Sequence, residues 1–113
     1  MRTAYIGVTA TNDVNARAKA AFKGTAQGMR ISFASLELMH RILTPNRWGV
    51  LQAMMGRGDI GVRELARALH RNVTAVRTDI AVLANAGLIV RADNGAVAFP
   101  YDAVRVDFVV KAA

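Results

Sequence analysis

The chain has 113 residues, a length typical of one domain, and hydrophobic residues make up 53% of it, enough to form a core. It holds 15 Lys and Arg against 8 Asp and Glu, and this net charge of +7 favours a polyanionic partner, with general solubility as the alternative explanation. The absence of cysteine excludes disulfides and thiolate zinc sites, and no apolar run approaches the ~18 residues that a membrane span needs. We therefore expect a cytoplasmic protein with no membrane partner.

The first third of the chain predicts strands and one basic helix. Arg2 to Val8 alternate weakly between apolar and polar residues, a pattern compatible with a short strand. Thr11 to Asp13 supply capping side chains for a helix over VNARAKAAFK, which Gly24 ends. This helix is either a docking arm or a dimer element. The segment MRISFA, residues 29–34, has the period of a half-buried strand.

Two helices are expected next. Ser35 caps the segment LELMHRIL, in which apolar residues recur at helical spacing. Thr44 as a cap and Pro45 at the first helical position begin a second helix that runs to about Arg57. Trp48 lies in a pattern that is otherwise core, so packing in the core is favoured over stacking on a base.

The segment from Val62 onward predicts a helix, a sharp turn and a second helix. The first helix covers Val62 to His70, the turn Arg71 to Val73, and the second helix Thr74 to Asn85. Gly87 suits the left-handed position that follows a helix. Small and hydrogen-bonding side chains at the front of the second helix would allow it to enter a major groove.

A hairpin and a last strand follow. Short strands over Leu88–Ala92 and Ala96–Phe99 flank the tight-turn signal Asp93-Asn94-Gly95, and Ile60 can add a small third strand beside them. From Val104 to Val110 apolar residues alternate with charged ones, which predicts an amphipathic strand. Its partner is either the strand over residues 29–34 or a second subunit.

This order of elements predicts a mainly α fold with a small β component, a winged helix-turn-helix that grips duplex DNA. The DNA-binding domain covers residues 35–100. Residues 1–34 form an N-terminal helix and strand extension, which is a dimer or partner element, and residues 101–113 form a C-terminal strand.

The residues expected to contact double-stranded DNA fall into three groups. On the second helix, Arg77 can reach a guanine edge or a phosphate, and its neighbours can bond or touch bases. Together with Arg77, the basic residues on the first helix, in the turn and on the wing can neutralise about five phosphates, giving a salt slope of about −4 to −5. Two asparagines lie in the turn and at the wing tip. The full set is Arg63, Arg67, Arg71, Asn72, Thr74, Ala75, Arg77, Thr78, Arg91 and Asn94.

Other charged residues are assigned structural roles or left open. Asp79 is acidic and cannot favour phosphate, so we expect it to bond a neighbouring arginine and orient it. Surface solvation or an intramolecular ion pair is at least as good an interpretation as DNA contact for Arg41, Arg47 and Arg57.

Catalytic constellations are not apparent in the sequence. Ser32 and Ser35 have no credible base partner, and His40 and His70 are far apart without carboxylates at ligand spacing. No glycine-rich phosphate loop follows a strand. We therefore expect neither an enzyme nor a cofactor or metal, and we expect both histidines at the surface or its boundary.

Several short motifs occur in a recognisable order. They are Leu43-Thr44-Pro45 with Arg47, Arg63-Glu64-Leu65-Ala66, Val76-Arg77-x-Asp79-Ile80, Gly87-Leu88-Ile89 and Pro100-Tyr101-Asp102. This set, within residues 32–109, resembles the small predicted transcriptional regulators of bacteria and archaea that carry a MarR-like winged helix.

The resemblance implies sequence-specific DNA binding by a dimer. From the motif, the wing and the positive charge, our first hypothesis is a repressor that acts as a homodimer. Groove reading would fall on Thr74, Ala75, Arg77 and Thr78, and the wing role on Arg91 to Gly95. The chain departs from MarR proteins in ending with a strand in place of a long C-terminal dimerisation helix, which puts the usual dimer and ligand pocket in doubt.

An alternative function follows from the same resemblance. Small regulators of this type are similar to antitoxins, which neutralise a toxin protein and repress their own operon. In that case residues 1–23 or the strand over Val104–Val110 would cover the toxin by helix docking or strand addition.

Overall fold

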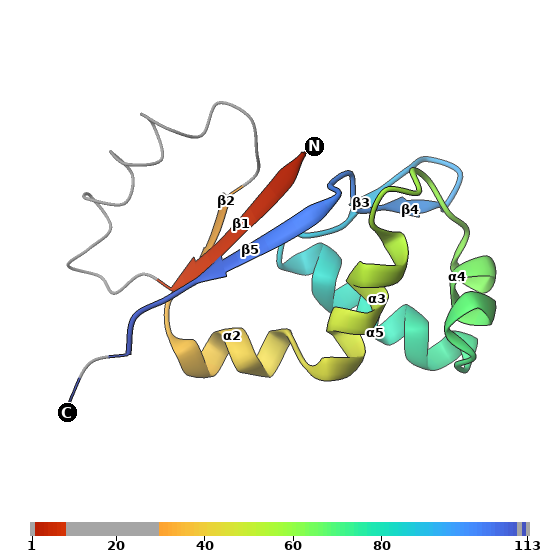
Figure 1. Cartoon of the computed structure of the whole chain (residues 1–113). Helices are drawn as coiled ribbons and strands as arrows, with labels where there is room; N and C mark the ends of the chain where they lie inside the picture. Colours follow the sequence, from red (N-terminus) through yellow and green to blue (C-terminus); the bar gives the residue numbers. More distant parts are fainter. Residues whose placement is uncertain (1, 9–29, 111, 113) are drawn as a thin grey trace. The chain divides into compact units, whose positions relative to one another are not determined.

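The computed structural model of the chain describes residues 2–8, 30–110 and 112 (Figure 1). The chain divides into a strand unit, residues 1–41 and 101–113, and a helical unit, residues 42–100. The described residues form four helices, a three-stranded sheet and a two-stranded sheet, so the fold mixes helices with small sheets. The basic helix predicted between Asn12 and Gly24 lies outside the described residues.

The sheet of the strand unit has three parallel strands. β1 (Thr3–Val8) is central, β2 (Arg30–Phe33) pairs with one of its edges, and β5 (Ala103–Asp107) pairs with the other. The prediction of a strand in each of these segments is confirmed, but the expected pairing of the last strand with residues 29–34 is wrong, because β1 lies between them. Alternation identifies a strand with one apolar face, but it does not identify which strand lies beside it.

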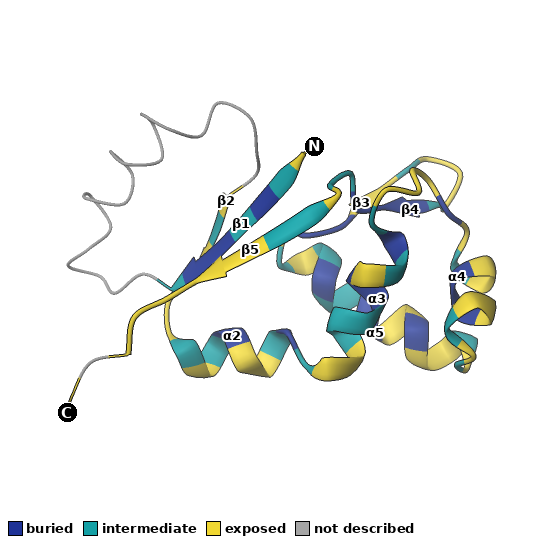
Figure 2. Cartoon of the chain, in the orientation of Figure 1, coloured by how far each residue is buried: buried dark blue, intermediate teal, exposed yellow. Residues whose placement is uncertain are grey.

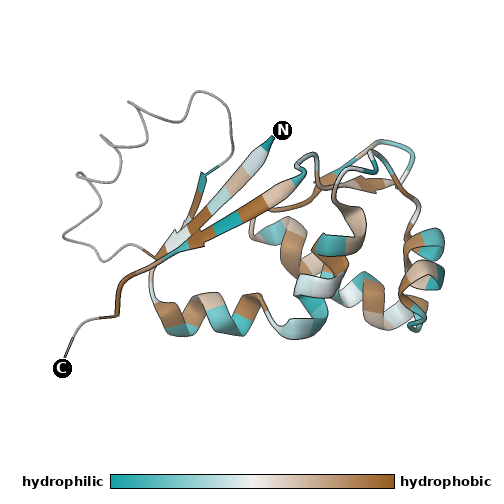
Figure 3. Cartoon of the chain, in the orientation of Figure 1, coloured by the Kyte–Doolittle hydropathy of each residue, from teal (hydrophilic) through white to brown (hydrophobic). Residues whose placement is uncertain are grey.

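Apolar residues share one face of this sheet. Ile6 lies opposite Ile31 on β2 and opposite Val106 on β5, and residues directly opposite each other project to the same face. Hydropathy alternates along β1 and β5 for this reason (Figure 3). Ala4 and Ile6 are almost completely buried, whereas Val106 is 38% exposed. The apolar face is therefore buried along the central strand and partly open at β5.

Helix α2 (Leu36–Ile42) follows β2. The Ser35 hydroxyl accepts a hydrogen bond from the Leu38 N–H at 3.0 Å, which confirms the predicted cap. Met39 is buried, and Glu37 and Arg41 form an exposed ion pair at 2.9 Å, one turn apart.

Three helices carry most of the helical unit: α3 (Pro45–Met54), α4 (Val62–Leu69) and α5 (Val73–Asn85). The Thr44 hydroxyl accepts from the Arg47 N–H at 3.3 Å, as the cap prediction requires. Helix α3 ends at Met54, before the predicted limit near residue 57, because the backbone already leaves the helical region at the next residue (ψ 129°).

The turn between α4 and α5 is closed by backbone hydrogen bonds. His70 adopts a left-handed conformation (φ 55°), which is uncommon for a residue other than glycine. The Arg71 N–H donates to the Ala66 carbonyl at 3.0 Å, and the Asn72 side-chain oxygen accepts from the Thr74 N–H at 2.7 Å. These bonds end α4 and begin α5 within a few residues, which confirms the predicted helix, turn and helix.

The predicted hairpin is also present. β3 (Val90–Arg91) and β4 (Val97–Ala98) are antiparallel, and Gly95 takes the positive φ of 89° that the turn requires. Ile60 adds a short bridge beside β4, with mutual N–H to carbonyl bonds to Val97 of 2.9 Å, so its predicted role is confirmed.

The core of the helical unit is formed by its three helices, β4 and the segments that connect them, whereas both residues of β3 are exposed. Its buried apolar residues are Leu43, Val50, Leu51, Met54, Ile60, Leu65, Ala66, Val76, Ile80, Leu83, Leu88, Ile89, Val97, Ala98 and Phe99. Among the described helices, none combines the length and the apolar character needed to cross a bilayer.

Candidate nucleic-acid interface

Helix α5 has one buried side and one open side (Figure 2). Its apolar residues Val76, Ile80 and Leu83 are each at most 1% exposed, as their spacing predicts. The residues predicted to read a groove are all exposed: Thr74, Ala75, Arg77 and Thr78. The Thr78 hydroxyl donates to the Thr74 carbonyl at 3.1 Å, so its hydrogen is used within the helix and its oxygen keeps the capacity to accept a hydrogen bond.

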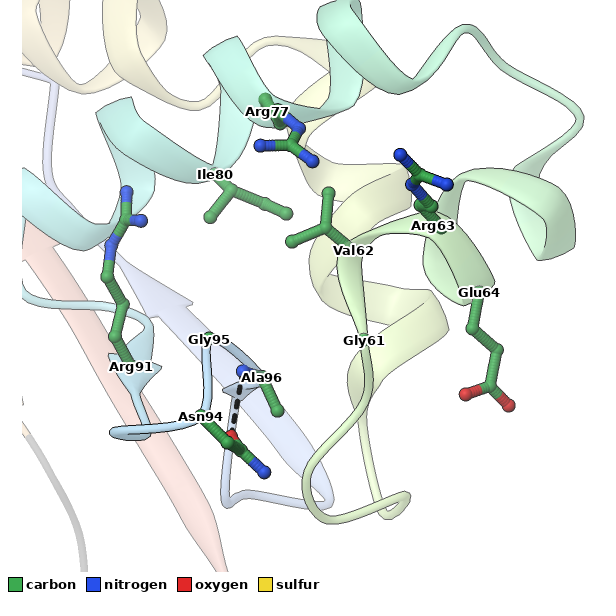
Figure 4. Close-up of a pocket in the computed structure, with 10 residues that line it drawn as sticks. All are labelled: Gly61, Val62, Arg63, Glu64, Arg77, Ile80, Arg91, Asn94, Gly95 and Ala96. Atoms are coloured by element: carbon green, nitrogen blue, oxygen red, sulfur yellow. Dashed lines mark hydrogen bonds between the residues drawn. The ribbon is translucent and has the colours of Figure 1, made fainter.

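A hollow of about 850 Å³ lies beside this open side. Arg63 from the start of α4, Arg77 from α5 and Arg91 from β3 all line it, and Figure 4 shows their side chains gathered around one space. The complete lining is Gly61, Val62, Arg63, Glu64, Arg77, Ile80, Arg91, Asn94, Gly95 and Ala96. The three arginines, up to 28 positions apart in the sequence (63 to 91), are thus brought to a single surface.

The charge of this hollow is strongly positive. The described lining residues include three arginines and one acid, Glu64, which gives the hollow a net charge of +2. The Glu64 side chain points away from Arg77 and Arg91 (Figure 4). Guanidinium groups present paired N–H donors that match phosphate oxygens or a guanine edge. By contrast, the described residues contain no group of three or more His, Cys, Asp or Glu that could hold a metal ion.

Asn94 lines the same hollow at the tip of the hairpin. Its side-chain oxygen accepts from the Ala96 N–H at 3.0 Å (dashed line in Figure 4). The Ala92 N–H donates to the Ala96 carbonyl at 2.8 Å and closes the same loop. The oxygen of Asn94 therefore shapes the hairpin tip, and only its amide NH₂ is left to face a ligand.

A second, smaller hollow of about 360 Å³ lies where α4 approaches the start of α5. It is lined by Arg63, Ala66, Arg67, Arg71 and Val73. Arg63 lines both hollows, so the arginines of α4 extend the same positive surface. We call the exposed arginines Arg63, Arg67, Arg77 and Arg91 the basic surface.

Asp79 is the one buried charged residue in the described part of the chain, with 8% of its surface exposed. Its Oδ1 accepts from Arg47 Nε at 3.0 Å, and its Oδ2 lies 2.8 Å from Arg71 Nη2. The second contact is an ion pair whose angles are too poor for a good hydrogen bond. Arg47 Nη1 also donates to the Ile42 carbonyl at 3.1 Å. The expectation that Asp79 bonds a neighbouring arginine is confirmed, and Arg47, from another helix, is a second partner.

This triad of Arg47, Arg71 and Asp79 links the beginning of α3, the turn and the middle of α5. The Arg71 side chain is 24% exposed and already has a carboxylate partner, whereas the arginines of the basic surface have none among the residues that the structure describes. It is therefore held as part of the scaffold that fixes the turn, and its predicted contact with phosphate stays a prediction. Asn72 likewise uses its side-chain oxygen to cap α5.

Sequence reasoning left the partner of Arg47 open. Arg47 and Asp79 are 32 positions apart, and no local spacing connects them. The signal that was available is indirect: Asp79 falls in line with the buried residues Val76 and Leu83 on α5, and a buried carboxylate needs a cation. Arg41 also has an intramolecular partner, Glu37, whereas Arg57 is exposed.

Comparison with known proteins gives one match. The family model described as HVO_A0114 matches residues 42–106, more than half of the chain, including the whole helical unit and most of β5. No curated protein and no solved structure matches the chain.

Proposed function

The chain belongs to the HVO_A0114 family, and we propose that it is a sequence-specific regulator of transcription that binds double-stranded DNA. In this proposal residues 42–100 act as a winged helix-turn-helix of MarR-like type. Helix α4 and the turn support α5, α5 enters the major groove, and the hairpin of β3 and β4 is the wing that contacts the backbone. Repression is the form of regulation we expect.

The exposed side of α5 supports this assignment. Thr74, Ala75 and Thr78 are small or short, so the front of the helix can approach base edges without a steric barrier. Arg77 follows on the same helix and is long enough to donate two hydrogen bonds to a guanine. The buried side of α5 packs in the core, which fixes the position of the helix, while its opposite side stays exposed.

The observation that carries the proposal is the convergence of Arg63, Arg77 and Arg91 on one hollow from three separate elements. A solvated surface has no need to gather like charges, because they repel one another when no anion is present. A nucleic acid supplies phosphates along a continuous path, and this path can run past the basic surface from α4 to the wing. With Arg77 on a base edge, the other three arginines of the basic surface engaged with phosphate would give a salt slope near −3.

The test begins with selection of binding sites from a pool of random DNA duplexes by the full chain. We expect a common sequence to be enriched, and fluorescence anisotropy should then show tighter binding to that duplex than to a scrambled duplex of equal length. Affinity for both should fall steeply with salt. Failure to enrich any sequence, together with binding that does not respond to salt, would overturn the proposal.

Two variants separate base reading from charge. Arg77→Ala should weaken binding to the selected duplex by about 10- to 100-fold and reduce its preference over the scrambled duplex. Arg67→Ala should weaken binding to both duplexes similarly and reduce the salt slope by about one. Arg41→Ala, which removes the same charge from α2, serves as the matched control and should leave both affinities nearly unchanged. If all three variants bound both duplexes as tightly as the wild-type chain, the basic surface would be excluded as the interface.

A further inference from the structure

Strand β5 is an edge strand of the sheet in the strand unit. One edge of β5 pairs with β1, and no described strand pairs with the other. Exposed edges are usually protected by Pro, by charged side chains, Lys above all, or by a bulge, because their free N–H and C=O groups otherwise pair with another strand. The sequence AVRVD of β5 contains neither proline nor lysine, and it pairs with β1 in unbroken register over its five residues. Within the described part of the strand unit, this edge therefore has no strand beside it.

Apolar side chains are exposed along β5 and directly after it (Figure 2). Val106 and Phe108 are each 38% exposed, and Val109 and Val110 are 72% and 71% exposed. A run of large apolar residues beside an unpaired edge is typical of a surface that another chain covers.

We propose that a second copy of this chain covers this surface, its β5 pairing antiparallel with the first around a two-fold axis at Val106. The charges of β5 favour this occupant. In this register Arg105 lies opposite the partner's Asp107, and by symmetry Asp107 lies opposite the partner's Arg105. Two identical strands therefore complement each other without any other protein.

The register is selected by the same charges. Moving the axis by one residue places Arg105 opposite the partner's Arg105, or Asp107 opposite the partner's Asp107, and like charges directly opposite one another are unfavourable. With the axis at Val106, residue 104 pairs with residue 108, so Val104 meets the partner's Phe108 on the apolar side. Neither Arg105 nor Asp107 has an ion pair within the described part of the chain. In this register the side chains of the two copies are complementary on both the apolar and the polar face of the paired strands.

The result is one continuous sheet in which β5 of each copy is no longer an edge. The interface is short, so we expect a dimer that dissociates on dilution. The inference does not depend on DNA binding, and it is tested without DNA.

The test is analytical ultracentrifugation of the full chain at low ionic strength over a range of concentrations. Arg105→Asp and Asp107→Arg each turn both symmetry-related pairs from attractive to repulsive, and each should raise the dimer dissociation constant about tenfold or more. The double variant restores opposite charges and should recover the dimer. An equimolar mixture of the two single variants should also recover it, as a heterodimer. Arg57→Asp, the same charge change as Arg105→Asp but in an exposed loop, is the control.

Rescue by the double variant or by mixing cannot arise from chains that failed to fold, so either would support the proposal. A wild-type chain that is monomeric at every concentration would overturn the proposal. A dimer whose dissociation constant is changed by neither charge reversal would also overturn it. The register has a second test, because the chain has no cysteine. Val106→Cys should form a disulfide between copies on oxidation, since opposed residues lie within disulfide reach, whereas Asp59→Cys should not. Equal cross-linking of both variants would exclude an axis at Val106.

Discussion

The helical unit and the strand unit use charged side chains in different ways. In the helical unit, Asp79 is buried and binds two arginines that come from different parts of the chain. In the strand unit, the ion pair of Glu37 and Arg41 lies one turn apart on α2 with both side chains largely exposed, 80% and 69%. The first arrangement connects separate elements, whereas the second joins two residues of the same helix.

The difference follows from how each unit is held together. Parallel strands are fixed by a ladder of backbone hydrogen bonds, so the sheet needs no side-chain link between its elements. Helices have no backbone bonds to one another, and their relative positions depend on packing and on links such as the triad. The charged residues of the helical unit thus form two groups. A buried triad connects α3, the turn and α5, and an exposed basic surface is the part that we propose binds DNA.

The largest expected effect tests the buried role. Asp79→Ala removes the shared carboxylate and leaves the Arg47 and Arg71 guanidinium groups largely buried without it, so the free energy of unfolding should fall by about 3 kcal/mol. Trp48 is the one tryptophan of the chain and lies on α3, so its fluorescence during urea unfolding reports on the helical unit.

Asp79→Asn is the matched control for this measurement. It keeps the shape of the side chain and one acceptor oxygen, and it should lose less stability than the alanine variant. If Asp79→Ala instead cost under about 1 kcal/mol, the triad would be no more important than a surface pair, and the contrast between the two units would fail.

An intermediate effect is expected at the helix caps, where the two units should behave alike. Asn72 caps α5 and Ser35 caps α2, each through a side-chain oxygen that accepts a backbone N–H. Replacing either by alanine should cost about 1 kcal/mol, because each leaves one N–H of the first turn without its partner. Thermal unfolding followed by circular dichroism measures both, and a loss at Asn72 several times that at Ser35 would show that the turn before α5 does more than cap the helix.

The smallest effect is expected at the exposed pair. Glu37→Ala should change the free energy of unfolding by about 0.5 kcal/mol or less, because water screens an exposed pair and flexible side chains are ordered to form it. The same urea titration, followed by circular dichroism, provides the measurement. A loss comparable to that of Asp79→Ala would mean that exposure does not separate the two kinds of pair.

Much of the fold could be predicted because its signals are local. The caps at Ser35 and Thr44, the turn signal that ends in Gly95, and the spacing of apolar residues on α5 each depend on a few neighbouring residues. Such signals identify helices, turns and strands with little reference to the rest of the chain. The end of α3 was less accurate, since helix ends depend on competing interactions over one or two residues.

The candidate site was predictable only as a set of residues. Helical spacing indicates that Arg63 and Arg77 are exposed, but it cannot say that they share one hollow with Arg91. It also cannot separate Arg71, which an intramolecular carboxylate holds, from Arg67, which lies open on α4. All of these residues are arginines with the same charge, so residue type alone does not distinguish their roles.

By itself the sequence determined which segments become helices, strands and turns, which side of each is apolar, and that the chain carries excess positive charge. These properties follow from backbone preference and side-chain period, which act over a few residues. Only the tertiary structure decided that β1 lies between β2 and β5, that Asp79 binds both Arg47 and Arg71, and that Arg63, Arg77 and Arg91 meet. Contacts between distant residues depend on how whole elements pack, and packing is a property of the complete chain.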